Sequence, residues 1–324
     1  MKELEPANRG LAFGNVKLKD VNIAILIAAL VSSLLVPLTG LPYLRFIMMY
    51  FFAYAIYTAS WDLLYSYSGQ LSLGQALPFG LGAFFTIMFI QKIPLIPSAV
   101  LGTLAAAAVG GSVGATTIRL KPGYQGIALL LFSQVLYQIT LILYGEEGLS
   151  IFSATPLSQT TMYISGVLIF AVAMFAIYLI QTSTYRLKLL AIKGDNLAAN
   201  VSGINVPVHK AIVFFLSSLI AGIGGTYYAI FTSHADFTVF AVPNSFLPIG
   251  MAIVGGTGFL GGPIIGSAII TLLIRILPIW YSLAVTLFVY GLAVMAILKI
   301  RPTGIIGLLL RRKTAKGGPK AAKG

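Results

Sequence analysis

One long polar segment, TSTYRLKLLAIKGDNLAANVSGINVPVHK at residues 182–210, interrupts an otherwise apolar chain. It separates the apolar segments into a group before it and a group after it. It contains a single acid, Asp195, against four basic residues: Arg186, Lys188, Lys193 and Lys210. Loops rich in Lys and Arg are kept on the cytoplasmic side of a membrane. We therefore expect this segment to lie in the cytoplasm, between two groups of membrane-spanning helices.

The same segment has the pattern of a short amphipathic helix. Leu190, Leu197 and Val201 recur at helical spacing. Asp195 is a residue type that caps helix N-termini, and Gly203 is a type that ends helices. A membrane protein that presents such a helix to the cytoplasm usually presents it to a partner.

Composition indicates a polytopic membrane protein. The chain has 324 residues, of which 58% are hydrophobic and 9% are charged, with a mean hydropathy of +0.94. Soluble domains have about 25% charged residues. The net charge of +13 comes from the N-terminal arm, the central loop and the tail. This distribution is typical of cytoplasmic loops, so we expect no nucleic-acid partner. The absence of cysteine and the presence of only two histidines argue against a metal site.

Apolar segments of roughly 20 residues can each cross a membrane as a helix. The sequence predicts an all-α, polytopic bundle of about ten spans, with short or broken helices near residues 69–90 and 245–254. The predicted apolar segments are 24–38, 42–65, 69–90, 95–118, 124–144, 163–180, 211–231, 245–254, 264–277 and 279–298.

Loop charges give the expected orientation. Residues 1–21 form a cytoplasmic arm, 22–300 the membrane domain and 301–324 a basic cytoplasmic tail that we expect to be disordered. With both termini inside, the basic loops lie inside and the acidic loop of Glu146 and Glu147 lies outside.

Several enzyme motifs are absent or misplaced. The chain has no P-loop for ATP. The glycines at residues 256–261 match a dinucleotide fingerprint, but they lie between membrane segments, and the next forty residues contain no acid to bind a ribose. Residues 110–114 match a nucleophile elbow inside an apolar span, where small residues normally allow helix packing. We therefore expect no catalytic site.

Charges are rare inside the predicted spans. Between residues 124 and 298 only Arg275 is charged within a span, so the usual mark of ion-coupled transport is absent there. Trp61 and Asp62 fall near the end of the second span, where we expect them to reach the membrane interface by snorkelling.

Two segments are candidates for contact with a solute. At residues 68–75 the sequence SGQLSLGQ places polar side chains and glycines at membrane depth, where an unwound backbone can line a polar path. The alternative is tight packing of small residues. The tentative path residues are Gln70, Ser72, Gly74 and Gln75. Glu146 and Glu147 form either an external docking site or a solvated loop, and residues 255–263 are interpreted as a tight cytoplasmic turn.

Four of these places together resemble a known family. They are residues 69–75 with 80–83, residues 145–149, the central loop, and residues 255–258 with 262–266. From about residue 50 to 305 the chain resembles the membrane-spanning permease subunits of ATP-driven importers for branched-chain amino acids. The similarity is to the LivM type, within the hydrophobic amino acid and urea uptake group.

The resemblance implies that the central loop is the coupling segment that docks on an ATPase subunit. Gly203 would let the chain turn back after the helix. Ala198 and Ala199 would allow close approach, and Leu197 and Val201 would supply apolar contact. Together with Asp195, these are the six residues expected to couple the permease to the ATPase.

The resemblance also implies the assembly and its location. The partners would be a second, LivH-like permease, two cytoplasmic ATP-binding subunits that hold ATP and Mg, and an external solute-binding protein, all at the cytoplasmic membrane of a prokaryote. The permease itself would bind no cofactor and would import its solute by alternating access. A stand-alone secondary transporter or channel for a small polar solute stays open as an alternative.

Overall fold

A computed structural model describes residues 15–150, 158–300 and 304–307 and is almost entirely helical. Most of the predicted N-terminal segment (residues 1–21) and of the predicted tail (residues 301–324) lies outside the described residues. The first helix already begins at Asn15, within that N-terminal segment. The α-helices are α1 Asn15–Leu35, α2 Pro42–Ser68, α3 Ala76–Ile90, α4 Leu95–Thr117, α5 Pro122–Tyr144, α6 Gln159–Thr182, α7 Tyr185–Gly194, α8 Asn196–Val201, α9 Val206–Thr232, α10 Val242–Gly255, α11 Gly261–Ile276 and α12 Leu283–Ile300.

Short elements connect these helices. The described residues include three 3-10 helices, η1 Val36–Thr39, η2 Phe237–Phe240 and η3 Leu277–Ile279. Strands β1 Leu149–Ser150 and β2 His234–Ala235 form a small antiparallel ladder in which Leu149 pairs with Ala235.

Each predicted apolar segment corresponds to one helix of the bundle. Seven helices are long and apolar enough to cross a membrane, within the described residues. The three shorter apolar helices are Val21–Leu35 of α1, α3 and α10. Residues 69–75 are not helical, and the last helix begins at Leu283 rather than at residue 279. The count of ten crossings and the side of each terminus stay predictions.

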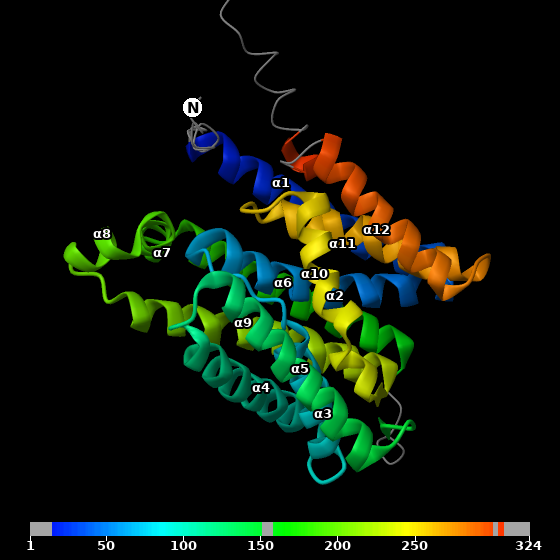
Figure 1. Ribbon diagram of the computed structural model, residues 1–324. Coiled ribbons are helices and arrows are strands. Elements are labelled where there is room, and N and C mark those ends of the chain that lie inside the picture. The colour runs from blue at the N-terminus through cyan, green and yellow to red at the C-terminus, as the bar shows by residue number, and fades with distance from the viewer. Residues whose placement is uncertain (1–14, 151–157, 301–303, 308–324) are drawn as a thin grey trace, which may run out of the picture.

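The long helix α2 runs through the centre of the bundle (Figure 1). It packs on α9 on one side and on α11, α10 and α6 on others. Helices α3, α4 and α9 form a tightly packed group next to it, and α1, α11 and α12 lie together in the upper part of the view. An all-round apolar helix is expected to be buried. Accordingly Phe52, Tyr57 and Trp61 of α2 are almost fully enclosed.

Small residues bring the helices of the lower group into contact. A methyl carbon at Gly225 of α9 would lie 1.8 Å from the carbonyl oxygen of Phe79 on α3. At Gly111 and Gly114 of α4 it would lie 2.2 and 2.3 Å from the rings of Phe215 and Phe214. The glycines of residues 110–114 therefore serve close helix packing, as the packing interpretation predicts.

The glycine-rich turn between α10 and α11 is equally tight. A methyl carbon at Gly255 would lie 1.8 Å from the carbonyl oxygen of Gly262, and one at Gly262 would lie 1.7 Å from that of Gly256. These glycines contact one another, which leaves no space for a dinucleotide. The interpretation of residues 255–263 as a tight turn agrees with this structure.

Candidate functional site

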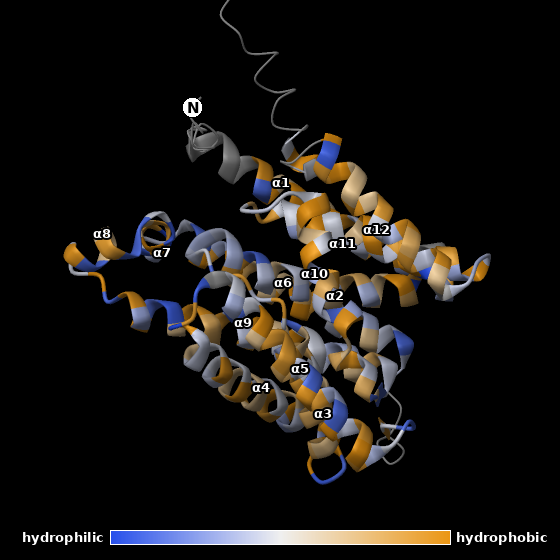
Figure 2. Ribbon diagram, in the orientation of Figure 1, coloured by the Kyte–Doolittle hydropathy of each residue, from blue (hydrophilic) through white to orange (hydrophobic). Residues whose placement is uncertain are grey.

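Helices α7 and α8 form an arm that stands out from one end of the bundle, at the left of Figure 1. We refer to residues 185–201 as the arm. Figure 2 shows hydrophilic residues gathered on the arm and on the chain that follows it, whereas most of the bundle is hydrophobic. The composition of the loop thus corresponds to a separate, solvent-facing substructure.

Asp195 separates the two helices of the arm. Its backbone is extended, and one carboxylate oxygen, Oδ1, accepts hydrogen bonds from the backbone N–H groups of Leu197 at 2.7 Å and Ala198 at 3.3 Å. Gly203 follows α8 in the left-handed conformation, with φ of +81°. The predicted cap and stop residues are therefore both present. However, Leu190 belongs to α7, so the predicted apolar row extends over two helices.

The side chains of α8 divide into two faces. Leu197 and Val201 are 76% and 86% exposed, and Ala198 is exposed beside them. Ala199, in contrast, is only 4% exposed and packs with Ile192 of α7. The side chain of Ala199 therefore holds α8 against α7, and its expected role in close approach to an ATPase stays a prediction.

The arm is attached to the end of α2. Lys193 Nζ donates a 2.8 Å hydrogen bond to the carbonyl oxygen of Ser66 and lies over the ring of Tyr65. Burial lowers the pKa of the Lys193 ammonium, and the negative charge of Asp62 opposes this shift. The guanidinium of Arg186 lies 5.6 Å from the centre of the Tyr67 ring. Two basic residues of α7 thus contact the last turns of α2.

Asp62 is a buried acid below this contact. It is 1% exposed, so the expectation that it reaches the interface is wrong, and so is the same expectation for Trp61, at 2%. Asp62 Oδ1 accepts hydrogen bonds from Ser66 Oγ at 2.6 Å and from the backbone N–H of Gly258 at 2.9 Å. A buried carboxylate needs such donors. The bond from Gly258 joins α2 to the α10–α11 turn.

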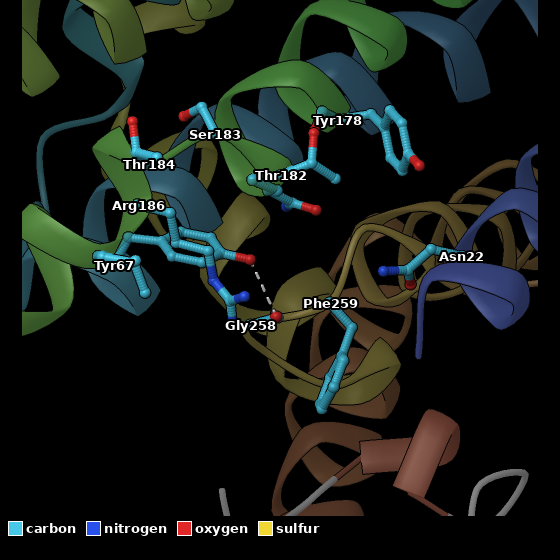
Figure 3. A pocket seen from close by; sticks show the side chains of 11 residues that line it. Asn22, Tyr67, Tyr178, Thr182, Ser183, Thr184, Arg186, Gly258 and Phe259 are labelled. Atoms are coloured by element: carbon cyan, nitrogen blue, oxygen red, sulfur yellow. Dashed lines mark hydrogen bonds between the residues drawn. The ribbon is translucent and has the colours of Figure 1, made fainter. Parts of the chain in front are cut away.

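Tyr67 adds a second bond to the same turn, since its hydroxyl donates to the carbonyl oxygen of Gly258 at 3.0 Å (Figure 3). The end of α2, one face of α7 and the α10–α11 turn therefore meet at one place. We refer to Asp62, Ser66, Tyr67, Lys193 and Gly258 as the arm junction.

The tentative path residues lie inside the protein, between α2 and α3. Gln70, Ser72 and Gln75 are each 2% exposed. Gln75 Nε2 donates to the hydroxyls of Ser60 and Ser217, both at 2.9 Å.

The rest of this unwound segment is also closely packed. The carbonyl oxygen of Ser72 accepts from Trp61 Nε1 at 2.7 Å. A methyl carbon at Gly74 would lie 2.0 Å from the carbonyl oxygen of Leu129 on α5. Gln70 Nε2 donates to Ser68 Oγ at 3.0 Å. In this state the segment joins α2, α3, α5 and α9, and both glutamine amides donate hydrogen bonds within the protein.

Glu146 and Glu147 lie at the end of the bundle opposite the arm. Both are exposed in the turn between α5 and β1. Beyond this turn, the short ladder joins β1 to β2. The structure does not bring these two acids together with the arm residues or the path residues.

A family model for the branched-chain amino acid transport system / permease component matches residues 43–298. The chain belongs to this permease family. Comparison with curated proteins and with solved structures found no match. The match extends from the start of α2 to the last turns of α12, so it includes the arm, the junction and the path segment.

The family membership has direct consequences for the chain. This permease is a multi-pass membrane protein, and its family is described as the permease component of branched-chain amino acid transport systems, which indicates a transport subunit. Permeases of such systems act with partner subunits.

Sequence reasoning missed the junction of this permease. The available signal was an acid within an apolar helix with a serine four residues later, Asp62 and Ser66, which share one face of α2. In the sequence, Lys193 is one of four basic residues of the central loop, and nothing local distinguishes it from the others. Its hydrogen bond to α2 depends on a contact between residues 127 positions apart, which no local pattern reveals.

Proposed function

We propose that this permease is the LivM-type membrane subunit of an ATP-driven importer for branched-chain or other hydrophobic amino acids. It would act at the cytoplasmic membrane of a prokaryote with a LivH-like second permease. Two cytoplasmic ATP-binding subunits would supply the energy and hold ATP and Mg. An external solute-binding protein would deliver the solute to the face that carries Glu146 and Glu147.

The observation that carries this proposal is the exposed apolar face of α8. Leu197 and Val201 are more exposed than expected for apolar side chains on a polar arm, with fractions of 76% and 86%. Exposed apolar groups rimmed by polar residues mark sites of protein contact. A groove on an ATPase subunit would cover them, and Ala198 between them leaves room for close approach.

A cleft beside α8 supports the same contact. It has a volume of about 650 Å³ and separates α8 from the ends of α4 and α9. Arg119 and Lys210 line it together with the amide side chains of Asn196 and Asn200, and no acid does so in the part of the chain that the structure describes. Complementary charge favours a partner with acidic residues at this position.

The arm junction would transmit a displacement of the arm to the membrane helices. A displacement of α8 would move α7, to which Ala199 and Ile192 hold it. Lys193 would transmit the displacement to the end of α2, and Asp62 would transmit it to the α10–α11 turn. The ATPase would drive the change only if it bound the arm with different free energies in the two states.

Substitutions on the exposed face of α8 test the proposal. Val201→Glu and Ala198→Trp should prevent the purified permease from binding its ATPase subunits and should abolish ATP-dependent uptake in proteoliposomes. Leu41→Ser is a matched control, because Leu41 is 58% exposed at the other end of α2. Normal assembly and uptake with both α8 variants would refute the role of this face.

The burial of Asp62 favours the alternative, a stand-alone secondary transporter. A buried carboxyl can carry the coupling proton in such proteins. Against this role, both oxygens of Asp62 accept hydrogen bonds from Ser66 or Gly258, which is the pattern of a structural anchor. Concentrative uptake by the purified chain without ATPase subunits would support the alternative.

A further inference from the structure

A small polar pocket lies where α6 turns into α7, facing the α10–α11 turn and the start of α1 (Figure 3). Its volume is about 240 Å³. This is below the roughly 300–1,000 Å³ of pockets for drug-sized ligands, so it suits a compact group. Polar side chains from three helical elements line it: Asn22, Gln181, Thr182, Ser183, Thr184 and Arg186.

The side chains of Gln181 and Arg186 lack hydrogen-bond partners among the described residues. Gln181 is only 8% exposed, and its amide makes no hydrogen bond there. Arg186 has a buried, unpaired Nε, and no carboxylate lies within ion-pair distance of its guanidinium in the described part of the chain. Buried polar groups in native proteins are normally paired. An acceptor bound in the pocket would pair the buried Nε of Arg186, and the amide of Gln181 is free to donate beside it.

The donors favour an oxyanion. Arg186 supplies a planar guanidinium, which suits phosphate geometry, and it is held over the Tyr67 ring. The pocket also lies at the N-terminus of α7, where the helix dipole attracts negative charge. Asp62 does not line it, because its carboxylate is directed to Gly258 N.

We propose that this pocket binds a phosphate group. An anionic phospholipid is the source that the surroundings favour. The pocket begins at Thr182, where the apolar helix α6 ends and where headgroups are expected. Val172, Phe175 and Leu179 of α6 are 68%, 55% and 51% exposed and form one face that leads towards Thr182. That face would contact the acyl chains of a lipid whose phosphate lies against Arg186.

Lipid binding to the full-length chain tests the proposal. Native mass spectrometry in a neutral detergent would measure the apparent affinity for dioleoylphosphatidylglycerol. Arg186→Gln should weaken this affinity at least tenfold. Lys188→Gln is the matched control, since Lys188 is an exposed cation on the same helix that does not line the pocket. Equal weakening by the two variants would indicate diffuse charge attraction and would overturn the proposal.

Inorganic phosphate distinguishes the two sources. If the lipid binds and millimolar phosphate does not change the melting temperature, the ligand of the pocket is the phospholipid. A phosphate-induced rise in melting temperature that Arg186→Gln removes supports the pocket with a soluble phosphate compound as its ligand. If neither probe binds, the proposal is wrong, and a loss of ATPase-subunit binding in Arg186→Gln would then assign Arg186 to a protein contact.

Gln181→Leu keeps the test decisive if Arg186→Gln fails to fold. The replacement has a similar volume and removes a side chain that has no partner within the described structure. The variant should fold normally and bind phosphatidylglycerol at least threefold more weakly. Unchanged binding would overturn the assignment of the pocket.

Discussion

Lys193 Nζ of α7 lies 2.8 Å from the carbonyl oxygen of Ser66, in the last turn of α2. That carbonyl has no hydrogen-bond donor within α2, because the final four C=O groups of a helix lack intrahelical partners. The arm therefore contacts the central helix at a position where α2 needs a donor. Ser66 also donates through its hydroxyl to Asp62, so one residue links the arm with the buried acid.

Lys193→Met tests the first of these links. The replacement keeps an apolar stem of similar length but removes the donor to Ser66. We expect ATPase subunits to bind normally, because the exposed face of α8 is unchanged, while ATP-dependent uptake falls several-fold. Co-purification and proteoliposome uptake would measure the two effects. Lys188→Met, on the exposed face of α7, should leave both unchanged, and an equal loss in both variants would contradict the assignment.

Asp62 should be important for stability through its hydrogen bonds. Asp62→Leu leaves the N–H of Gly258 without its acceptor, and a buried unpaired group costs about 1–3 kcal/mol. We expect a clearly lower melting temperature in detergent. Asp62→Asn retains an acceptor oxygen and should keep most of the stability and the ATP-dependent uptake. Normal folding with complete loss of uptake in Asp62→Asn would instead indicate a proton-carrying role.

Close helix contacts should make specific glycines intolerant of a methyl group. Gly225→Ala would force α9 away from Phe79 on α3, and overpacking of this kind costs about 1–3 kcal/mol. We expect a lower melting temperature and weaker assembly. Gly123→Ala in α5 is the matched control, because nothing lies within 4 Å of the added carbon. Its stability should be unchanged or slightly higher, and similar losses in both variants would refute the packing argument.

The buried segment between α2 and α3 should affect uptake through Gln75. Gln75→Leu removes the donor to Ser60 and Ser217 while nearly preserving volume. If the segment lines the solute path in another state, the variant should change the concentration dependence of uptake but still bind ATPase subunits. Transport assays over a range of leucine concentrations would detect this change. Loss of assembly would favour the alternative that the segment only packs the helices.

Much of the fold could be predicted from the sequence, because its signals are local. Apolar segments predicted the position of each apolar helix of the bundle, seven of which are long enough to cross a membrane within the described residues, and loop composition located the polar arm. The capping oxygen of Asp195 and the positive φ of Gly203 also follow from preferences of single residue types. Family membership follows from the sequence as well, over residues 43–298.

Tertiary structure alone decided which side chains are buried, and with that the candidate sites. The apolar pattern of α2 predicts a buried helix, but it does not show that the carboxylate of Asp62 is paired with the N–H of Gly258, a residue 196 positions away. Ala198 and Ala199 are chemically identical, yet the contact with Ile192 buries only Ala199. The pocket at Arg186 likewise requires α1, α6, α7 and the α10–α11 turn to meet. Such contacts join residues far apart in the chain, and their geometry depends on how the whole bundle packs.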